Sequence, residues 1–318
     1  MKKSRLLLIL SLLVFVFSCK EEESLTNKPG TYSSKDIFVI EQGVSSAEMV
    51  ISNITHLIQL AIDDEQVLYN NGIVYPIITK EKENESQISP YPMILTIDFG
   101  TDTTQGYDNR YRCGKIIANI SSHWKDSLSL IDADVQNYYM ATHSPNETNV
   151  ENQVIVTGCN SNLRLKIRNV GEKSCFDFNT YPTQQIITDS AHFSTPLGDI
   201  TLSTRRLTYY YGGFDTPDYK DDKTYNTLFS GGTASDKKDD NWHWYSEMVG
   251  QTNEGLEYFA YNRNCFWLVS GNLKLNYTDI KTQRKRTKII DFGRFDQTNC
   301  DNIASYLTNG LNIVFNLP

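Results

Sequence analysis

The sequence predicts a mainly β protein, an antiparallel β-sandwich or a β-meander with one N-terminal amphipathic helix. The composition supports this class, because 19 tyrosines and 14 phenylalanines against five methionines favour strands over a helical bundle. Many short segments with strand-like patterns follow one another, and turn residues such as Gly212-Gly213 and Gly231-Gly232 separate them. Of the two architectures, the sandwich is favoured.

A helix is predicted at residues 45–70. Ser45 followed by Glu48 forms a capping-box pattern at its start, and Gly72 supplies a stop just after its end. His56 is interpreted as a packing or surface residue rather than a ligand. Apolar residues recur at helical spacing, so one face of the helix should pack on the body: Val50, Ile54, Leu57, Ile58 and Ala61.

Strands are predicted for the rest of the body. Residues 163–168 and 273–278 alternate between apolar and polar side chains, which is the pattern of a strand with one buried face. The other predicted strands are 73–79, 93–99, 115–121, 153–157, 200–211, 256–261 and 311–316.

An internal repeat links two distant parts of the body, near residues 97–109 and 290–302. Each copy reads Ile-Asp-Phe-Gly and continues, after seven intervening residues, with Asp-Asn, at Asp108-Asn109 and at Asp301-Asn302. We interpret each copy as a strand that ends in a glycine turn. The Asp-Asn pair then begins the next element, because such side chains bond to nearby backbone amides.

The N-terminus carries an export signal. A basic head precedes an apolar run at residues 6–17, which is too short to span a bilayer and suits a secretory signal. The run ends at Ser18-Cys19 and resembles the bacterial lipobox, although Val16 and Phe17 depart from its usual leucine-first form. The resemblance implies that residues 1–18 are a signal peptide, and that Cys19 becomes the acylated membrane anchor. An ordinary secretory signal with an unrelated cysteine is the alternative.

The residues after Cys19 carry an address. Lys20, Glu21 and Glu22 resemble the lysine-acidic export signal of Bacteroidota lipoproteins, which implies the outer membrane and an exposed position on the cell surface. Residues 19–36 are predicted to be an acidic flexible tether, and residues 37–318 are the β-rich body.

With the lipobox cysteine, the export signal and the repeat, the chain resembles an uncharacterised family of Bacteroidota surface lipoproteins. Arg110 and Gly114-Lys115-Ile116 follow the first repeat copy and add to the likeness, whereas Cys113 departs from it. The resemblance implies a β-rich surface protein and no known activity.

Charge and motifs narrow the function classes. The net charge is −8, and it becomes −11 once residues 1–18 and their three basic side chains are removed. An acidic body argues against nucleic acid as a partner. No catalytic or cofactor motif occurs, and the scattered histidines and cysteines lack metal-site spacing, so no enzyme, cofactor or metal is predicted. A disulfide between Cys265 and Cys300 is the pairing we favour, with buried free thiols as the alternative.

Two aromatic stretches are the candidate ligand-binding residues. Flat aromatic rings stack on sugar rings, while neighbouring Asp and Asn side chains bond to hydroxyl groups. The residues of one parity in each stretch would equally suit a core-facing strand. The candidates are Trp242, Trp244 and Tyr245 in the first stretch, and Tyr209 and Tyr211 in the second.

Together these patterns predict a lipid-anchored surface protein with a binding or adhesive role toward glycans or host matrix. One alternative is a structural or assembly component of an envelope complex, which would dock a partner protein through the helix or a strand edge. A third is a secreted hydrolase whose carboxylates the sequence does not single out.

Overall fold

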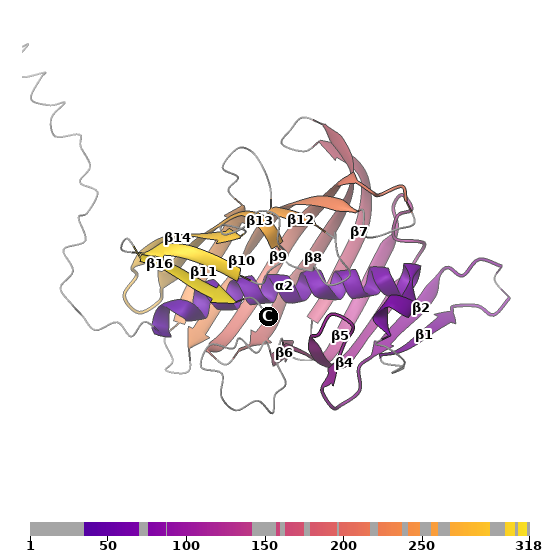
Figure 1. Ribbon diagram of the computed structural model, residues 1–318, viewed down its shortest axis with the longest axis horizontal. Coiled ribbons are helices and arrows are strands. Elements are labelled where there is room, and N and C mark those ends of the chain that lie inside the picture. Colours follow the sequence, from indigo (N-terminus) through magenta and orange to yellow (C-terminus); the bar gives the residue numbers. More distant parts are fainter. Residues whose placement is uncertain are drawn as a thin grey trace, which may run out of the picture. The chain divides into compact units, whose positions relative to one another are not determined.

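The computed structural model describes residues 35–69, 76–86, 88–141, 157–159, 163–174, 179–195, 197–216, 222–236, 241–248, 256–259, 268–292, 303–308 and 311–316. Within these residues, one long helix and one short 3₁₀ helix accompany a single antiparallel sheet (Figure 1). The predicted class, mainly β with one helix in the N-terminal part, is confirmed.

The order of the strands in the sheet is nearly the same as their order along the chain. Its strands are β1 (Ile77–Lys82), β2 (Met93–Asp98), β3 (Thr104–Gln105), β4 (Tyr111–Ile120), β5 (Leu130–Ala141), β6 (Thr157–Cys159), β7 (Leu163–Ser174), β8 (Thr180–Ser194), β9 (Gly198–Gly212), β10 (Lys223–Asp236), β11 (Asn241–Met248), β12 (Leu256–Phe259), β13 (Leu268–Asp279), β14 (Lys285–Phe292), β15 (Ile303–Thr308) and β16 (Leu311–Asn316). The hydrogen-bonded order is β1-β2-β4-β5-β7-β8-β9-β10-β11-β13-β14-β15-β16, with β3, β6 and β12 paired beside this path.

This order is a meander, so of the two predicted architectures the meander is correct and the favoured sandwich is wrong. Consecutive strands pair with their sequence neighbours and form one sheet. The layer that covers the core face is a helix, α2 (Lys35–Asp63), which runs across the strands (Figure 1). It packs mainly on β9 and β10 and reaches β2.

Helix α2 differs from its prediction at both ends, since residues 45–70 were expected and Lys35–Asp63 are helical. The capping-box pattern misled the prediction. Ser45 lies inside the helix, where its Oγ donates to the Glu41 carbonyl at 2.8 Å, and Glu48 bonds to Arg206 of β9 instead. At the other end, a short 3₁₀ helix, η1 (Glu65–Leu68), follows the break after Asp63.

The helix is also buried more completely than one apolar face requires. Residues 40–51 are all buried, and the polar side chains among them are Glu41, Gln42, Ser45, Ser46 and Glu48. Buried polar groups need hydrogen-bond partners, and a helix of this kind must find them on the sheet. Among the described helices, none combines the length and the apolar character needed to cross a membrane.

Strand parity follows the sequence pattern closely. In β7, Leu163, Leu165 and Ile167 are buried, and the basic residue that follows each of them is exposed. In β13, Leu273 and Leu275 are buried in the same way. The apolar face of the sheet and α2 therefore form one hydrophobic core.

The first copy of the repeat is the predicted strand and glycine turn. Asp98 ends β2, and its Oδ1 accepts the Gly100 amide at 2.9 Å, where Gly100 has a φ of 74°. Asn109 also adopts a left-handed φ, of 62°. Of the second copy, Ile290, Asp291 and Phe292 lie in β14, and its remaining motif residues lie outside the described part of the chain.

Candidate functional site

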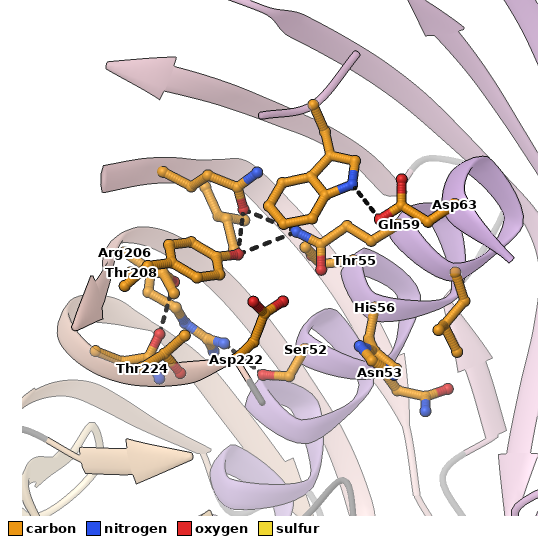
Figure 2. A pocket seen from close by; sticks show the side chains of 16 residues that line it. Ser52, Asn53, Thr55, His56, Gln59, Asp63, Arg206, Thr208, Asp222 and Thr224 are labelled. Atoms are coloured by element: carbon orange, nitrogen blue, oxygen red, sulfur yellow. Dashed lines mark hydrogen bonds between the residues drawn. The ribbon is translucent and has the colours of Figure 1, made fainter. Parts of the chain in front are cut away.

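A cavity of about 100 Å³ lies between the C-terminal half of α2 and the inner faces of β8, β9 and β10 (Figure 2). The helix contributes side chains three or four positions apart, which share one face. The strands contribute alternate residues, because alternate side chains point to the same side of a sheet. Trp124, from the loop between β4 and β5, and Asp222, just before β10, also line it.

Three buried amide side chains line this cavity, and each is held by its oxygen. Asn53 Oδ1 accepts from Arg112 Nη2 at 3.1 Å and from the Tyr138 hydroxyl at 3.1 Å. Because arginine only donates, this contact fixes which end of the Asn53 amide is the oxygen. Gln184 Oε1 accepts from Gln59 Nε2 at 2.9 Å.

The third amide, Asn226, accepts from the Thr208 hydroxyl at 2.6 Å. The NH₂ groups of Asn53, Gln184 and Asn226 have no hydrogen-bond partner among the described residues, and these side chains are only 2%, 1% and 3% exposed. A buried donor left unbonded costs about 1–3 kcal/mol. All three side chains line the same cavity, where an acceptor atom would stabilise each NH₂ group.

The charged groups on one side of the cavity are already paired. Arg206 Nη2 donates to Glu48 Oε2 at 2.5 Å, and Arg206 Nη1 donates to the Ser52 hydroxyl. The other Glu48 oxygen accepts from the Ser230 hydroxyl. This network fastens α2 to β9 and β10 and leaves Arg206 engaged.

His56 lies on the helix side of the cavity (Figure 2). Burial lowers the pKa of His56 from 6.5 to about 4, against which the nearby Asp108 acts only partly. His56 is therefore uncharged at neutral pH, and Arg206 is the one permanently cationic side chain among the described residues of the lining.

The end of the cavity is closed by the loop that carries Trp124. Trp124 Nε1 donates to Asp63 Oδ2 at 2.8 Å, and His123 Nε2 contacts Asp63 Oδ1 at 2.7 Å. The backbone amide of Lys125 donates to His123 Nδ1 at 3.2 Å, so the ring proton lies on Nε2 and is donated to Asp63. Both ring nitrogens are engaged, so this histidine–aspartate pair orients the loop.

An open groove of about 600 Å³ adjoins the cavity and shares Asp63 with it. The side chain of Lys125 forms part of the wall of this groove. Lys125 Nζ donates to the Thr216 carbonyl at 2.8 Å, lies 4.9 Å from the Trp124 ring centroid and lies 5.5 Å from that of Phe214.

The predicted aromatic residues do not gather at this cavity. Trp242 and Trp244 are 7% and 3% exposed and belong to the core, so their faces are not available to a sugar ring. Alternation along β11 explains this, because the even-numbered positions point inward. Tyr245 points outward and is half exposed.

The two aromatic stretches also lie far apart. Tyr245 pairs with Gly231, and Gly231 pairs with Ser203, so Tyr209 lies six residues farther along β9, or about 20 Å. Tyr209 is buried and Tyr211 is half-buried. The tyrosine that lines the cavity is the one between them, Tyr210.

The lipidation and export residues, Cys19, Lys20, Glu21 and Glu22, lie outside the described residues, as do Cys265 and Cys300. The lipidation, the export signal and the disulfide therefore remain predictions from the sequence. Cys113 is a free, half-buried thiol whose pKa burial raises. In the described part of the chain, no group of three or more His, Cys, Asp or Glu side chains is arranged to hold a metal ion.

The sequence did contain a signal for the cavity. Thr204, Arg206 and Thr208 occupy the buried parity of β9, where apolar residues are the rule. Three polar residues at alternate, inward-facing positions of a strand indicate a polar interior. Which positions of β9 face inward, however, is decided by its pairing with β8 and β10.

The fold and the site define a class of protein in which one meander sheet carries a buried helix, with a polar cavity between the two. Comparison of the chain with known protein families, curated proteins and solved structures finds no match.

Proposed function

We propose that the chain is a lipid-anchored protein of the outer membrane surface that binds a ligand in the cavity between α2 and β8–β10. The three unbonded amide donors carry this proposal, since each one is stabilised when an acceptor atom enters the cavity. The role is binding rather than catalysis, which agrees with a His123 whose two nitrogens already have partners.

The ligand-binding proposal has a matched pair of variants. Gln184 points into the cavity, and its neighbour Gln185 points to the opposite face of β8. Gln184→Leu removes one donor, so we expect a cavity ligand to bind about tenfold more weakly, whereas Gln185→Leu should leave its affinity unchanged. Ligand-observed NMR against a panel of mono- and oligosaccharides finds the compound, and calorimetry on both variants measures the change.

Two outcomes contradict this proposal. One is a panel in which no compound binds the wild-type protein. The other is a bound compound whose affinity is the same in Gln184→Leu and in Gln185→Leu, which would place its site elsewhere. Thermal unfolding of both variants checks that each is folded before affinities are compared.

The anchor is tested separately. Cys19→Ser removes the thiol that receives the diacylglyceryl group, so we expect the protein to leave the membrane fraction and to incorporate no labelled palmitate. Acyl chains supply about 0.8 kcal/mol per buried methylene group, and their loss should release the protein completely. Cys113→Ser is the control, because Cys113 belongs to β4 in the folded body. Palmitate incorporation into Cys19→Ser would contradict the anchor.

A further inference from the structure

We infer that the cavity receives a small neutral carbonyl group, in the form of an acetamido group, while the rest of the ligand stays outside it. This inference rests on the proposed ligand binding and names the part of the ligand that the cavity recognises. The size of the cavity, its unbonded donors, its charges and its exposed side each support it.

The size of the cavity limits what can enter it. A cavity of about 150 Å³ holds benzene, which has six carbon atoms, so a cavity of about 100 Å³ has room for about four non-hydrogen atoms. A sugar ring with its hydroxyl groups is larger than benzene and does not fit. An acetamido group consists of two carbons, one oxygen and one nitrogen, and it fits.

Two of the unbonded donors flank one position of the sheet. Gln184 pairs with Thr208 across β8 and β9, and Thr208 pairs with Asn226 across β9 and β10. The three residues therefore form a row, in which neighbouring strands are about 4.8 Å apart. Asn53 lines the cavity from α2 (Figure 2). An acceptor above Thr208 lies between the NH₂ groups of Gln184 and Asn226, and a carbonyl oxygen can accept from two donors at once.

The cations of the lining are not available to an acidic group. Arg206 donates to Glu48 and to Ser52, so its guanidinium is occupied. Burial lowers the pKa of His56 to about 4, which leaves this histidine uncharged at neutral pH. A site for carboxylates normally supplies an arginine or a lysine. The described lining therefore disfavours a carboxylate.

The acids of the lining are not available to a basic group either. Asp222 Oδ1 lies 4.0 Å from Lys125 Nζ, and Asp63 accepts from Trp124 and His123. An entering ammonium group would have to compete with these partners, and a buried charge without a counter-ion of its own is costly. Of the three charge states, the neutral one fits the cavity best.

The apolar part of the lining suits a methyl group. Leu60 and Ile186 line the cavity together with the rings of Trp124 and Tyr210, whose centroids are 5.7 Å apart. An acetamido group carries a methyl group next to its carbonyl. Its oxygen can therefore meet the amide donors while its methyl group is buried against these apolar side chains.

The cavity lies along the exposed stripe of α2. Ser52, His56, Gln59 and Asp63 all line the cavity, and all are at least partly exposed. Between them, every residue except Ile62 is buried. Side chains three or four positions apart share one face of a helix, so the cavity adjoins the side of α2 that solvent reaches. The N–H of an acetamido group, through which the rest of the ligand is attached, can point to this side.

The test uses the full-length protein in detergent micelles, with probes that differ in the group they offer. N-acetylglucosamine carries the acetamido group, glucose lacks it, and N-butanoylglucosamine has an acyl group that is longer by two carbons. We expect N-acetylglucosamine to bind and the other two to bind at least tenfold more weakly. Ligand-observed NMR should show the strongest saturation transfer at the acetyl methyl protons.

A fourth probe identifies the source of the acetamido group. N-acetylethanolamine is neutral and carries this group without a sugar. If it binds as tightly as N-acetylglucosamine, the source is any acetylated amine, and if it binds much more weakly, the source is an acetylated amino sugar. Both results support the acetamido group.

Asn226→Leu places the group in the cavity. The change removes one donor at nearly constant size, so we expect N-acetylglucosamine to bind about tenfold more weakly. Asn119→Leu is the matched control, because Asn119 is exposed on β4 and does not line the cavity. Circular dichroism and thermal unfolding check that both variants are folded, and Gln184→Leu replaces Asn226→Leu if the latter is not.

The outcomes separate this inference from the proposed function. A compound without an acetamido group that binds more tightly than N-acetylglucosamine, and that Gln184→Leu weakens, would overturn the inference and leave cavity binding intact. Equal affinities of the N-acetyl and N-butanoyl probes, or displacement of N-acetylglucosamine by acetate, would overturn it in the same way. If no bound compound responds to Gln184→Leu or to Asn226→Leu, both proposals fail.

Discussion

Arg112→Leu is expected to lower the free energy of unfolding by about 3–5 kcal/mol, because it removes one of the two arginine partners of the buried Asp108 carboxylate and leaves Arg110 alone to pair with it. Arg112 and Asp108 are both fully buried, with Nη2 of the first 2.5 Å from Oδ2 of the second. Burial alone would raise the pKa of Asp108, but Arg112 and Arg110 outweigh it and hold that pKa well below its usual range. Arg112 also donates to Asn53 of α2, so the variant loosens the helix and the cavity together.

Urea unfolding at neutral pH measures this effect. The control is Lys80→Met, which removes an ion pair with Glu65 in which both side chains are about a third exposed. Exposed pairs contribute little, so Lys80→Met should leave the unfolding midpoint nearly unchanged. If Arg112→Leu lowers the free energy of unfolding no more than Lys80→Met does, the ion pair of Arg112 with Asp108 does not stabilise the fold. Since domains are stable by about 5–15 kcal/mol, the expected loss is a large share of the total.

Glu41→Gln is expected to stabilise the protein by about 3 kcal/mol at pH 8 and to have little effect at pH 4.5. Glu41 lies in the first half of α2, fully buried, with the Tyr277 hydroxyl 3.2 Å from its Oε1. Burial raises the pKa of Glu41 from 4.5 to about 7. Between these values the folded protein keeps a proton that the unfolded chain has released. The resulting stability is complete below pH 4.5 and is lost as the pH rises through 7, whereas glutamine stays neutral throughout.

His56 changes the free energy of unfolding with pH in the opposite direction to Glu41. Its pKa is lowered from 6.5 to about 4 by burial, so the unfolded chain takes up a proton that the folded protein refuses. Its contribution is present above pH 6.5 and is lost as the pH falls toward 4. In the wild type the two slopes oppose each other between pH 4.5 and 6.5. In Glu41→Gln only the His56 slope remains, so its stability should fall below pH 6.5.

Urea midpoints at half-unit intervals from pH 4.5 to 8 measure both curves. Parallel curves for the wild type and Glu41→Gln across this range would contradict the raised pKa of Glu41. Glu65→Gln is the control, because that carboxylate is partly exposed and pairs with Lys80 at the surface.

The strands were predictable from the sequence because their local pattern suffices. Leu163, Leu165 and Ile167 alternate with basic residues, and this alternation alone assigns a face to each side chain. The helix bounds were less predictable, since Ser45 and Glu48 form a capping pattern whose actual partners lie elsewhere. The choice between sandwich and meander depended on what covers the inner face, and no short segment encodes that.

The cavity was not predictable for a related reason. Its contacts join positions far apart in the sequence, such as Gln59 with Gln184, 125 positions away, and Glu48 with Arg206, 158 positions away. The polar residues involved look like ordinary surface residues until the pairing places them inside. The aromatic residues Trp242 and Trp244 stood out by their type, and their type suits a core as well as a ligand site.

The burial of residues 40–51 of α2 on every side also has a consequence for how the chain folds. The helix precedes every strand, yet its contacts run from Asp63 with Trp124 to Glu41 with Tyr277, 236 positions later. No early fragment of the chain therefore contains the hydrogen-bond partners of Glu41 and Glu48. The helix cannot complete its contacts until β13 has been synthesised. Such distant contacts give a slow search, on the millisecond-to-second scale rather than the microsecond scale of helical bundles. The order in which the chain emerges is thus opposed to the order in which its core can close.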